Sequence, residues 1–140
     1  MGQNPLAKKM LLKPGQCALL LNAPQGFPAA LDPLPEGMAL ATVPDGQYDF
    51  VLLFVANSAE LAKFLPQTFT AVKPNGILWI SYPKQSAKVD TDLNRDVLWR
   101  IVEADGWSGV ALVAIDAVWS AMRFRPESQV GKKSRQEKRS

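Results

Sequence analysis

The sequence contains no histidine and a single cysteine, Cys17, among its 140 residues. Without histidine, Ser-His and Cys-His catalytic pairs are excluded, and so are most zinc sites, so we expect no metal centre. One cysteine excludes an intramolecular disulfide framework and is typical of a reducing cytoplasm. No apolar run approaches the ~20 residues that cross a bilayer. Residues 1–16 lack the apolar region of a signal peptide. We therefore expect a cytoplasmic protein without a membrane segment.

The chain also lacks an excess of charge of either sign, except in one short segment. The formal net charge is +3, from 16 basic and 13 acidic residues. Residues 127–140 hold five of the basic and two of the acidic residues, so this segment carries the whole excess. It has one aliphatic and no aromatic residue, which predicts a disordered basic tail. The tail could tether nucleic acid weakly, but five charges without aromatic partners make nucleic acid the less favoured partner.

Hydrophobic residues make up 47% and charged residues 21% of the chain, which is typical of one globular domain, here residues 1–126. Apolar runs bounded by turn residues predict strands over 17–21, 38–43, 48–55, 77–82, 109–115 and 117–124. The last two form either a hairpin around Asp116 or one bent strand. The few residues between 38–43 and 48–55 are too short for an ordinary parallel crossover. The segment 38–43 therefore lies outside the sheet or pairs at its edge in an unusual way.

Helical spacing of apolar residues predicts helices over 58–73 and about 91–104. Ser58 is the expected cap of the first helix, in which Pro66 should cause a kink or a break. Thr91 or Asp92 is the expected cap of the second. Alternating strands and helices favour an α/β fold with a mostly parallel sheet of five or six strands and helices on both faces. We expect the last strand to be antiparallel, at one edge.

Four stretches carry a family resemblance: Leu12-Lys13-Pro14-Gly15 before a strand, Tyr48-Asp49-Phe50-Val51, Val72-Lys73-Pro74-Asn75-Gly76-Ile77-Leu78, and Asp105-Gly106-Trp107 before two closing strands. Together they resemble the class I S-adenosylmethionine-dependent methyltransferase fold over roughly residues 6–126. The resemblance implies a truncated Rossmann-like sheet. The chain is also similar to a family of small bacterial proteins of unknown function with a methyltransferase-like fold, which implies no established activity.

The sequence departs from the methyltransferase pattern where the cofactor would bind. The family has a glycine-rich loop after its first strand, but residues 22–27 contain one glycine and a proline. The family also has an acidic residue at the end of strand two, where this chain has Ala41-Thr42-Val43, and its third strand is missing here. We therefore expect no cofactor and interpret the chain as a non-catalytic or vestigial domain that acts through a small ligand or a protein partner. The alternative is an S-adenosylmethionine-dependent enzyme with an atypical cofactor loop.

Ligands of open α/β sheets bind beyond the carboxyl ends of the strands. We expect three such ends and the following helix to converge, and no catalytic residue is assigned among them. The candidate ligand-binding residues are Asn22, Gln25, Asn57, Ser81, Tyr82, Lys84, Lys88 and Arg95. Two lysines near a helix N-terminus could hold an anion such as phosphate. The alternative is a capped helix with paired surface charges, because Asp90, Asp92 and Asp96 balance the three cations.

Two single residues and one surface complete the expectations. Cys17 lies in a predicted buried strand, so we expect an inert core thiol. Asp49 opens a strand and should accept hydrogen bonds at a turn. The third strand of the methyltransferase family and its helix, which are missing here, would have covered the sheet edge near residues 38–43. We therefore expect a homodimer to form at this edge.

Overall fold

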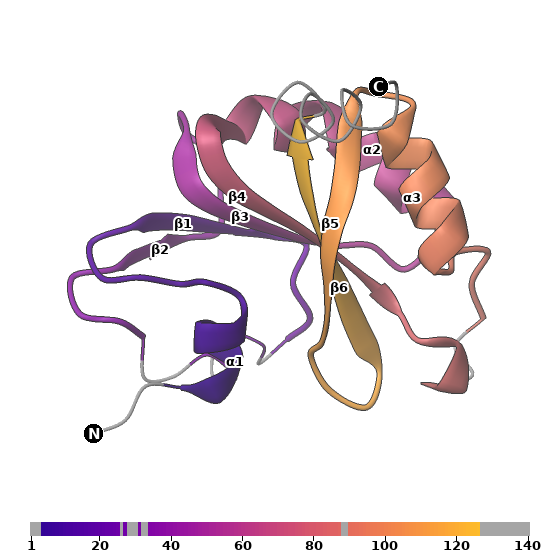
Figure 1. Ribbon diagram of the computed structural model, residues 1–140, viewed down its shortest axis with the longest axis horizontal. Coiled ribbons are helices and arrows are strands. Elements are labelled where there is room, and N and C mark those ends of the chain that lie inside the picture. Colours follow the sequence, from indigo (N-terminus) through magenta and orange to yellow (C-terminus); the bar gives the residue numbers. More distant parts are fainter. Residues whose placement is uncertain (1–3, 26, 28–30, 32–33, 88–89, 127–140) are drawn as a thin grey trace, which may run out of the picture.

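The computed structural model describes residues 4–25, 27, 31, 34–87 and 90–126, and within them six strands form one sheet (Figure 1). The strands are β1 (Cys17–Leu21), β2 (Ala39–Ala41), β3 (Tyr48–Phe54), β4 (Val72–Pro83), β5 (Trp107–Ala114) and β6 (Trp119–Pro126). The helices are α1 (Pro5–Lys9), α2 (Ser58–Ala71), the 3-10 helix η2 (Gln85–Ala87) and α3 (Arg95–Glu103). The basic tail predicted at residues 127–140 lies outside the described residues. No helix in the described part of the chain is long and apolar enough to cross a membrane.

The sheet has the order β2-β1-β3-β4-β6-β5, and the first four strands of this order, β2, β1, β3 and β4, are parallel to one another. Strand β6 is antiparallel to both β4 and β5, which confirms the predicted α/β class and the antiparallel last strand. The predicted edge position of that strand is wrong, because β5 forms the edge. Strand β6 buries Ala121, Met122 and Phe124, and this burial favours the inner position.

Of the two predicted arrangements for the last segments, a hairpin or one bent strand, the structure shows the hairpin. It consists of β5 and β6, and Asp116 lies in its turn. The Asp116 Oδ1 accepts hydrogen bonds from the backbone N–H groups of Val118 and Trp119, each at 2.8 Å. A short carboxylate side chain that binds the backbone two and three residues ahead is a typical turn device. The turn folds the chain back, so β6 lies antiparallel to β5.

Strand β2 is only three residues long and pairs with β1 at the sheet edge. The connection to β3 must pass β1, which lies between them in the sheet. A short return suffices because β2 ends beside Leu19, only two residues after β1 begins. The Tyr48 hydroxyl accepts from the Asp45 N–H at 3.1 Å and donates to the Val43 carbonyl at 3.3 Å. Residues 38–43 therefore include an edge strand, and the short link is held by Tyr48.

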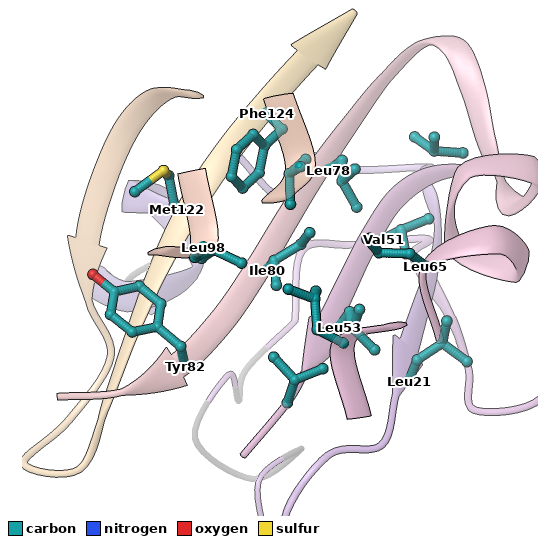
Figure 2. Packing of buried hydrophobic residues seen from close by; sticks show 14 of the residues in the cluster. Leu21, Val51, Leu53, Leu65, Leu78, Ile80, Tyr82, Leu98, Met122 and Phe124 are labelled. Atoms are coloured by element: carbon teal, nitrogen blue, oxygen red, sulfur yellow. The ribbon is translucent and has the colours of Figure 1, made fainter. Parts of the chain in front are cut away.

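Two apolar cores cover the two faces of the sheet, because side chains alternate along each strand. One core packs Val51, Leu53 and Ile80 under Leu65 of α2 and Leu98 of α3 (Figure 2). The other packs alternate strand residues under α1 and the segment between β1 and β2; its largest members include Phe50, Leu52, Phe54, Trp79, Met10 and Leu31. Helices thus lie on both faces, as predicted.

The helices start at asparagines rather than at the predicted caps. Asn57 Oδ1 accepts from the Glu60 N–H at 2.9 Å, and Asn94 Oδ1 accepts from the Val97 N–H at 2.9 Å. Asparagine is among the strongest caps, because its carboxamide oxygen satisfies a first-turn N–H group. Ser58, Thr91 and Asp92 are therefore not caps.

Helix α2 runs without interruption through Pro66, where we expected a kink or a break. Pro66 itself is exposed, and buried residues lie on both sides of it, Leu61 and Leu65 before and Thr68 and Ala71 after. Packing of these four against the sheet supplies most of the stability of such a helix. The hydrogen bond that Pro66 cannot make is therefore tolerated.

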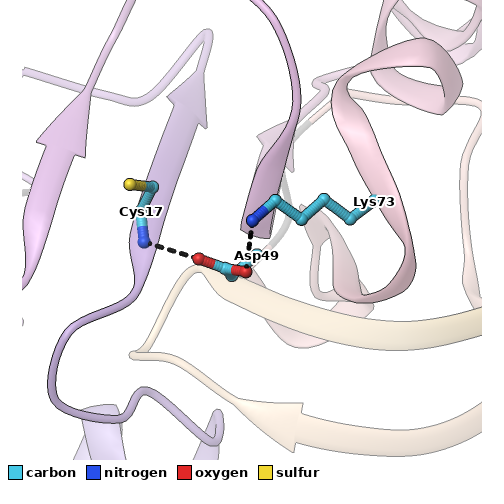
Figure 3. Close-up of polar contacts among 3 residues, drawn as sticks. All are labelled: Cys17, Asp49 and Lys73. Atoms are coloured by element: carbon cyan, nitrogen blue, oxygen red, sulfur yellow. Dashed lines mark hydrogen bonds and ion pairs between the residues drawn. The ribbon is translucent and has the colours of Figure 1, made fainter.

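Asp49 joins three segments at the amino end of the sheet (Figure 3). Its Oδ2 accepts from the Cys17 N–H at 2.9 Å, and its Oδ1 lies 2.9 Å from Lys73 Nζ. The Cys17 N–H and then Lys73 lower the pKa of Asp49 from its ordinary value of 3.8. Cys17 is exposed, not buried as expected, because the burial of β1 begins only at its second residue. Asp49 thus has a structural role at the start of β3.

Replacing Asp49 by asparagine should lower the free energy of unfolding at pH 7 by about 1 kcal/mol, because an N–H bond to a carboxylate is stronger than one to an amide. Since folding lowers the pKa of Asp49, its contribution is complete above pH 5 or so and is lost as the pH falls below 3.8. Urea unfolding at pH 7 and at pH 3 measures both effects. Asp45→Asn, in an exposed turn, is the control. A loss for Asp49→Asn that is equally large at both pH values would contradict this role.

Candidate functional site

The strand order reverses between β1 and β3. From β1 the chain moves to β2 on one side, then crosses to β3 on the other. In open α/β sheets the carboxyl ends at such a switch point form the usual ligand crevice. Asn22 follows β1 there, and residues 55–57 follow β3. Topology alone therefore selects this edge as the candidate site.

Asn22 turns the chain away from the sheet at the end of β1. Its φ is 58°, in the left-handed region that favours glycine and that asparagine tolerates better than most residues. Its Nδ2 donates to the Phe54 carbonyl at 2.8 Å and to Glu60 Oε1 at 3.3 Å. The side chain thus bridges the ends of β1 and β3.

Glu60 completes this arrangement from the first turn of α2. Its Oε1 accepts from the Ala56 N–H at 2.7 Å, while its own N–H donates to Asn57 Oδ1. We call Asn22, Asn57 and Glu60 the switch-point cluster. Sequence reasoning missed Glu60. The signal was its position three residues after Asn57, the spacing of a capping box.

A second group lies at the end of β4, around a hollow of about 290 Å³. The hollow is lined by Tyr82, Lys84, Asn94, Arg95, Asp96 and Ser120, and we call it the β4-end hollow. Tyr82 is 5% exposed, and this burial raises the pKa of its hydroxyl. Arg95 Nε lies 3.5 Å from Asp96 Oδ1, and both side chains are exposed. Because Arg95 and Asp96 balance each other, Lys84 gives the hollow an excess of one positive charge.

Asp92 connects the loop after β4 to the start of α2. Its Oδ1 accepts from the Ser58 N–H at 2.8 Å, and its Oδ2 accepts from the Ser58 hydroxyl. The hydroxyl bond and then the N–H bond lower the pKa of Asp92. A carboxylate at a helix N-terminus is also favoured by the helix dipole. The contact ties the loop that leads to Asn94 and Arg95 to the helix that carries Glu60.

The predicted ligand-binding residues fall into two groups instead of one. Asn22 and Asn57 belong to the switch-point cluster, while Tyr82, Lys84 and Arg95 line the β4-end hollow. The other three stand apart. Ser81 is fully buried, with no hydrogen-bond partner for its hydroxyl among the described residues; Gln25 is exposed; and Lys88 lies outside the described residues.

The comparisons with known proteins concern the fold. No family model matches the sequence, and no curated protein matches it. Solved structures do match. The DhpI protein in complex with SAH is 14% identical, with 86% of this chain and 81% of that chain covered and a TM-score of 0.62. A SAM-dependent methyltransferase from Aquifex aeolicus is 18% identical, with 85% and 86% covered and a TM-score of 0.60. A fibrillarin pre-rRNA processing protein from Methanococcus jannaschii is 14% identical, with 84% and 69% covered and a TM-score of 0.62.

These similarities confirm the predicted Rossmann-like, methyltransferase-like fold, and at such identities they establish the fold alone. They contradict the expectation of no cofactor, because the similar structures include complexes with SAM and with SAH. That expectation depended on the missing glycines after β1. In the structure, Asn22 adopts the backbone conformation that a glycine would supply. The resemblance to a small bacterial family stays a prediction.

Substitutions of Asn22 should separate its backbone role from its hydrogen bonds. Both Asn22→Gly and Asn22→Ala lose the bond to the Phe54 carbonyl, but only alanine is strained at a φ of 58°. We expect Asn22→Ala to reduce the free energy of unfolding more than Asn22→Gly does, by up to about 1 kcal/mol. Urea unfolding gives the ranking, with Gln25→Ala in the same loop as the neutral control. An alanine variant as stable as the glycine variant would show that this conformation is not required.

Proposed function

We propose that this chain is an S-adenosylmethionine-dependent methyltransferase that holds its cofactor at the switch-point cluster. The observation that carries the proposal is the polar cluster of Asn22, Asn57 and Glu60 at the point where the strand order reverses. Structures of the same fold in complex with SAM and SAH support it. They favour this alternative over the non-catalytic interpretation, which no finding supports.

The residues present fit the amino-acid end of the cofactor. Glu60 Oε1 is engaged by the Ala56 N–H and by Asn22, but its Oε2 has no hydrogen-bond partner among the described residues. This oxygen gives a carboxylate acceptor for an ammonium group. The Asn22 turn brings backbone close to the same place. At the ribose end β2 carries no acid, and Thr42, which follows it, offers an exposed hydroxyl.

The β4-end hollow is the place we assign to the methyl acceptor. When bound, S-adenosylmethionine supplies a methyl group on a positively charged sulfur. The hollow lies along the same carboxyl edge, and its neighbour Asp92 is bonded to Ser58 at the start of α2. Lys84 and Arg95 outnumber Asp96 there, so the hollow favours an acceptor with a negative group. Tyr82 and Ser120 offer hydroxyls that orient it.

Calorimetric titration with S-adenosylhomocysteine tests the cofactor site. We expect a Kd on the order of micromolar for the unmodified chain. Glu60→Gln should weaken binding at least about tenfold, because the charge opposite the ligand's ammonium is lost. The amide oxygen of glutamine still accepts from the Ala56 N–H, so the fold should be kept. Glu103→Gln, an exposed residue in the last turn of α3, is the matched control and should bind normally.

The two negative outcomes have different meanings. Absence of heat at millimolar S-adenosylhomocysteine would overturn the proposed function. Binding by the unmodified chain that Glu60→Gln leaves unchanged would keep the function but move the ammonium site away from Glu60. Thermal unfolding of both variants checks that a loss of binding is not a loss of fold.

A further inference from the structure

Strand β5 is the outermost strand at one edge of the described sheet, beside α3 (Figure 1). It is eight residues long, and Trp107–Ala114 contains no charged side chain and no proline. Edge strands are normally protected by charges, by proline or by shortness, and β2 at the other edge has only three residues. The single irregularity of β5 is a register shift between Gly109 and Ala111. No strand of the described residues pairs with the outer side of β5, so this edge is open to pairing with another strand.

Exposed apolar side chains lie next to this edge. Leu112 is 49% exposed, and Val110 and Trp99 are each 38% exposed. They line one hollow of about 250 Å³ between α3 and β5. A Cβ on Gly109 would lie 2.8 Å from Met122 Sδ, which is too close, and 3.5 Å from Trp99 Cε2, which is an ordinary contact, so Gly109 leaves room for Met122 and lies against Trp99. An apolar groove thus follows the unpaired backbone.

We propose that β5 pairs antiparallel with β5 of a second copy of this chain, which continues the sheet across a two-fold axis. The two copies would enclose Trp99, Val110 and Leu112 of each. Another strand can replace water at the unpaired N–H and C=O groups of this edge, and a second copy brings a strand of matching length without placing like charges opposite each other. A two-fold contact also closes on itself, so it gives a dimer and not a fibre.

Charge on the surrounding surface agrees with self-association. The exposed polar side chains of α3 beside the groove are Arg95, Asp96, Arg100 and Glu103, two of each sign. Residues 1–126 carry equal numbers of basic and acidic residues. Net charge of one sign keeps proteins apart, and the body of this chain has none. The dimer that the sequence predicts near residues 38–43 would use the opposite edge, so one experiment distinguishes the two.

Sedimentation velocity over a range of concentrations tests the proposal. We expect the unmodified chain to reach twice its mass of 15.3 kDa. Leu112→Lys should raise the Kd of the dimer at least about tenfold, because the two-fold axis buries two lysines. Val43→Lys is the matched control: Val43 is 70% exposed and lies beyond β2, at the other edge. It should leave the dimer intact.

A monomer at every concentration would overturn the proposal, and so would a dimer lost in Val43→Lys but kept in Leu112→Lys. Hydrogen exchange of the unmodified chain gives a second readout that needs no variant. Amides of residues 107–114 should exchange more slowly as the concentration rises, while those of residues 39–41 should not change. Equal rates in residues 107–114 at low and high concentration would contradict pairing through β5. None of these results depends on cofactor binding.

Discussion

Strand β3 buries six of its seven side chains, and they point alternately to the two faces of the sheet. Both faces must therefore be covered, by α2 and α3 on one side and by α1 with the segment between β1 and β2 on the other. Helix α2 is the crossover between β3 and β4, which it leaves parallel. Parallel strands end at one edge of the sheet, so the burial of β3 also decides where a ligand site can form.

The two ends of β3 differ in whether their polar side chains still have free hydrogen-bonding capacity. At the amino end, Asp49 is occupied by the Cys17 N–H and by Lys73. At the carboxyl end, Asn22 and Glu60 hold the strand ends in place, yet Glu60 keeps one oxygen without a partner in the described chain. Tertiary contacts at this end hold the polar side chains in place and leave a Glu60 oxygen available for a ligand, as a binding site requires.

The elements that could be predicted from the sequence were those fixed by local patterns. The run 17–21 coincides with β1, because an apolar run between turn residues has few other solutions. The sequence did not predict that β6 pairs with β4 and that β5 forms the edge. A hairpin pattern does not determine which of its two strands pairs with the rest of the sheet. Glu60 of the switch-point cluster was missed for a similar reason. Absent glycines suggested a lost cofactor, whereas the conformation of Asn22 and the reach of Glu60 depend on residues more than 30 positions apart.

We propose that the reversal of strand order between β1 and β3 is a cofactor site. An NMR titration of the labelled chain with S-adenosylhomocysteine tests this proposal, because backbone amides report binding residue by residue. We expect the largest shifts at Asn22, Ala56 and Asn57, with little change at Cys17 and Lys73 at the other end of the sheet. Shifts confined to the amino end, or no shifts at millimolar ligand, would show that the cofactor does not bind at this reversal.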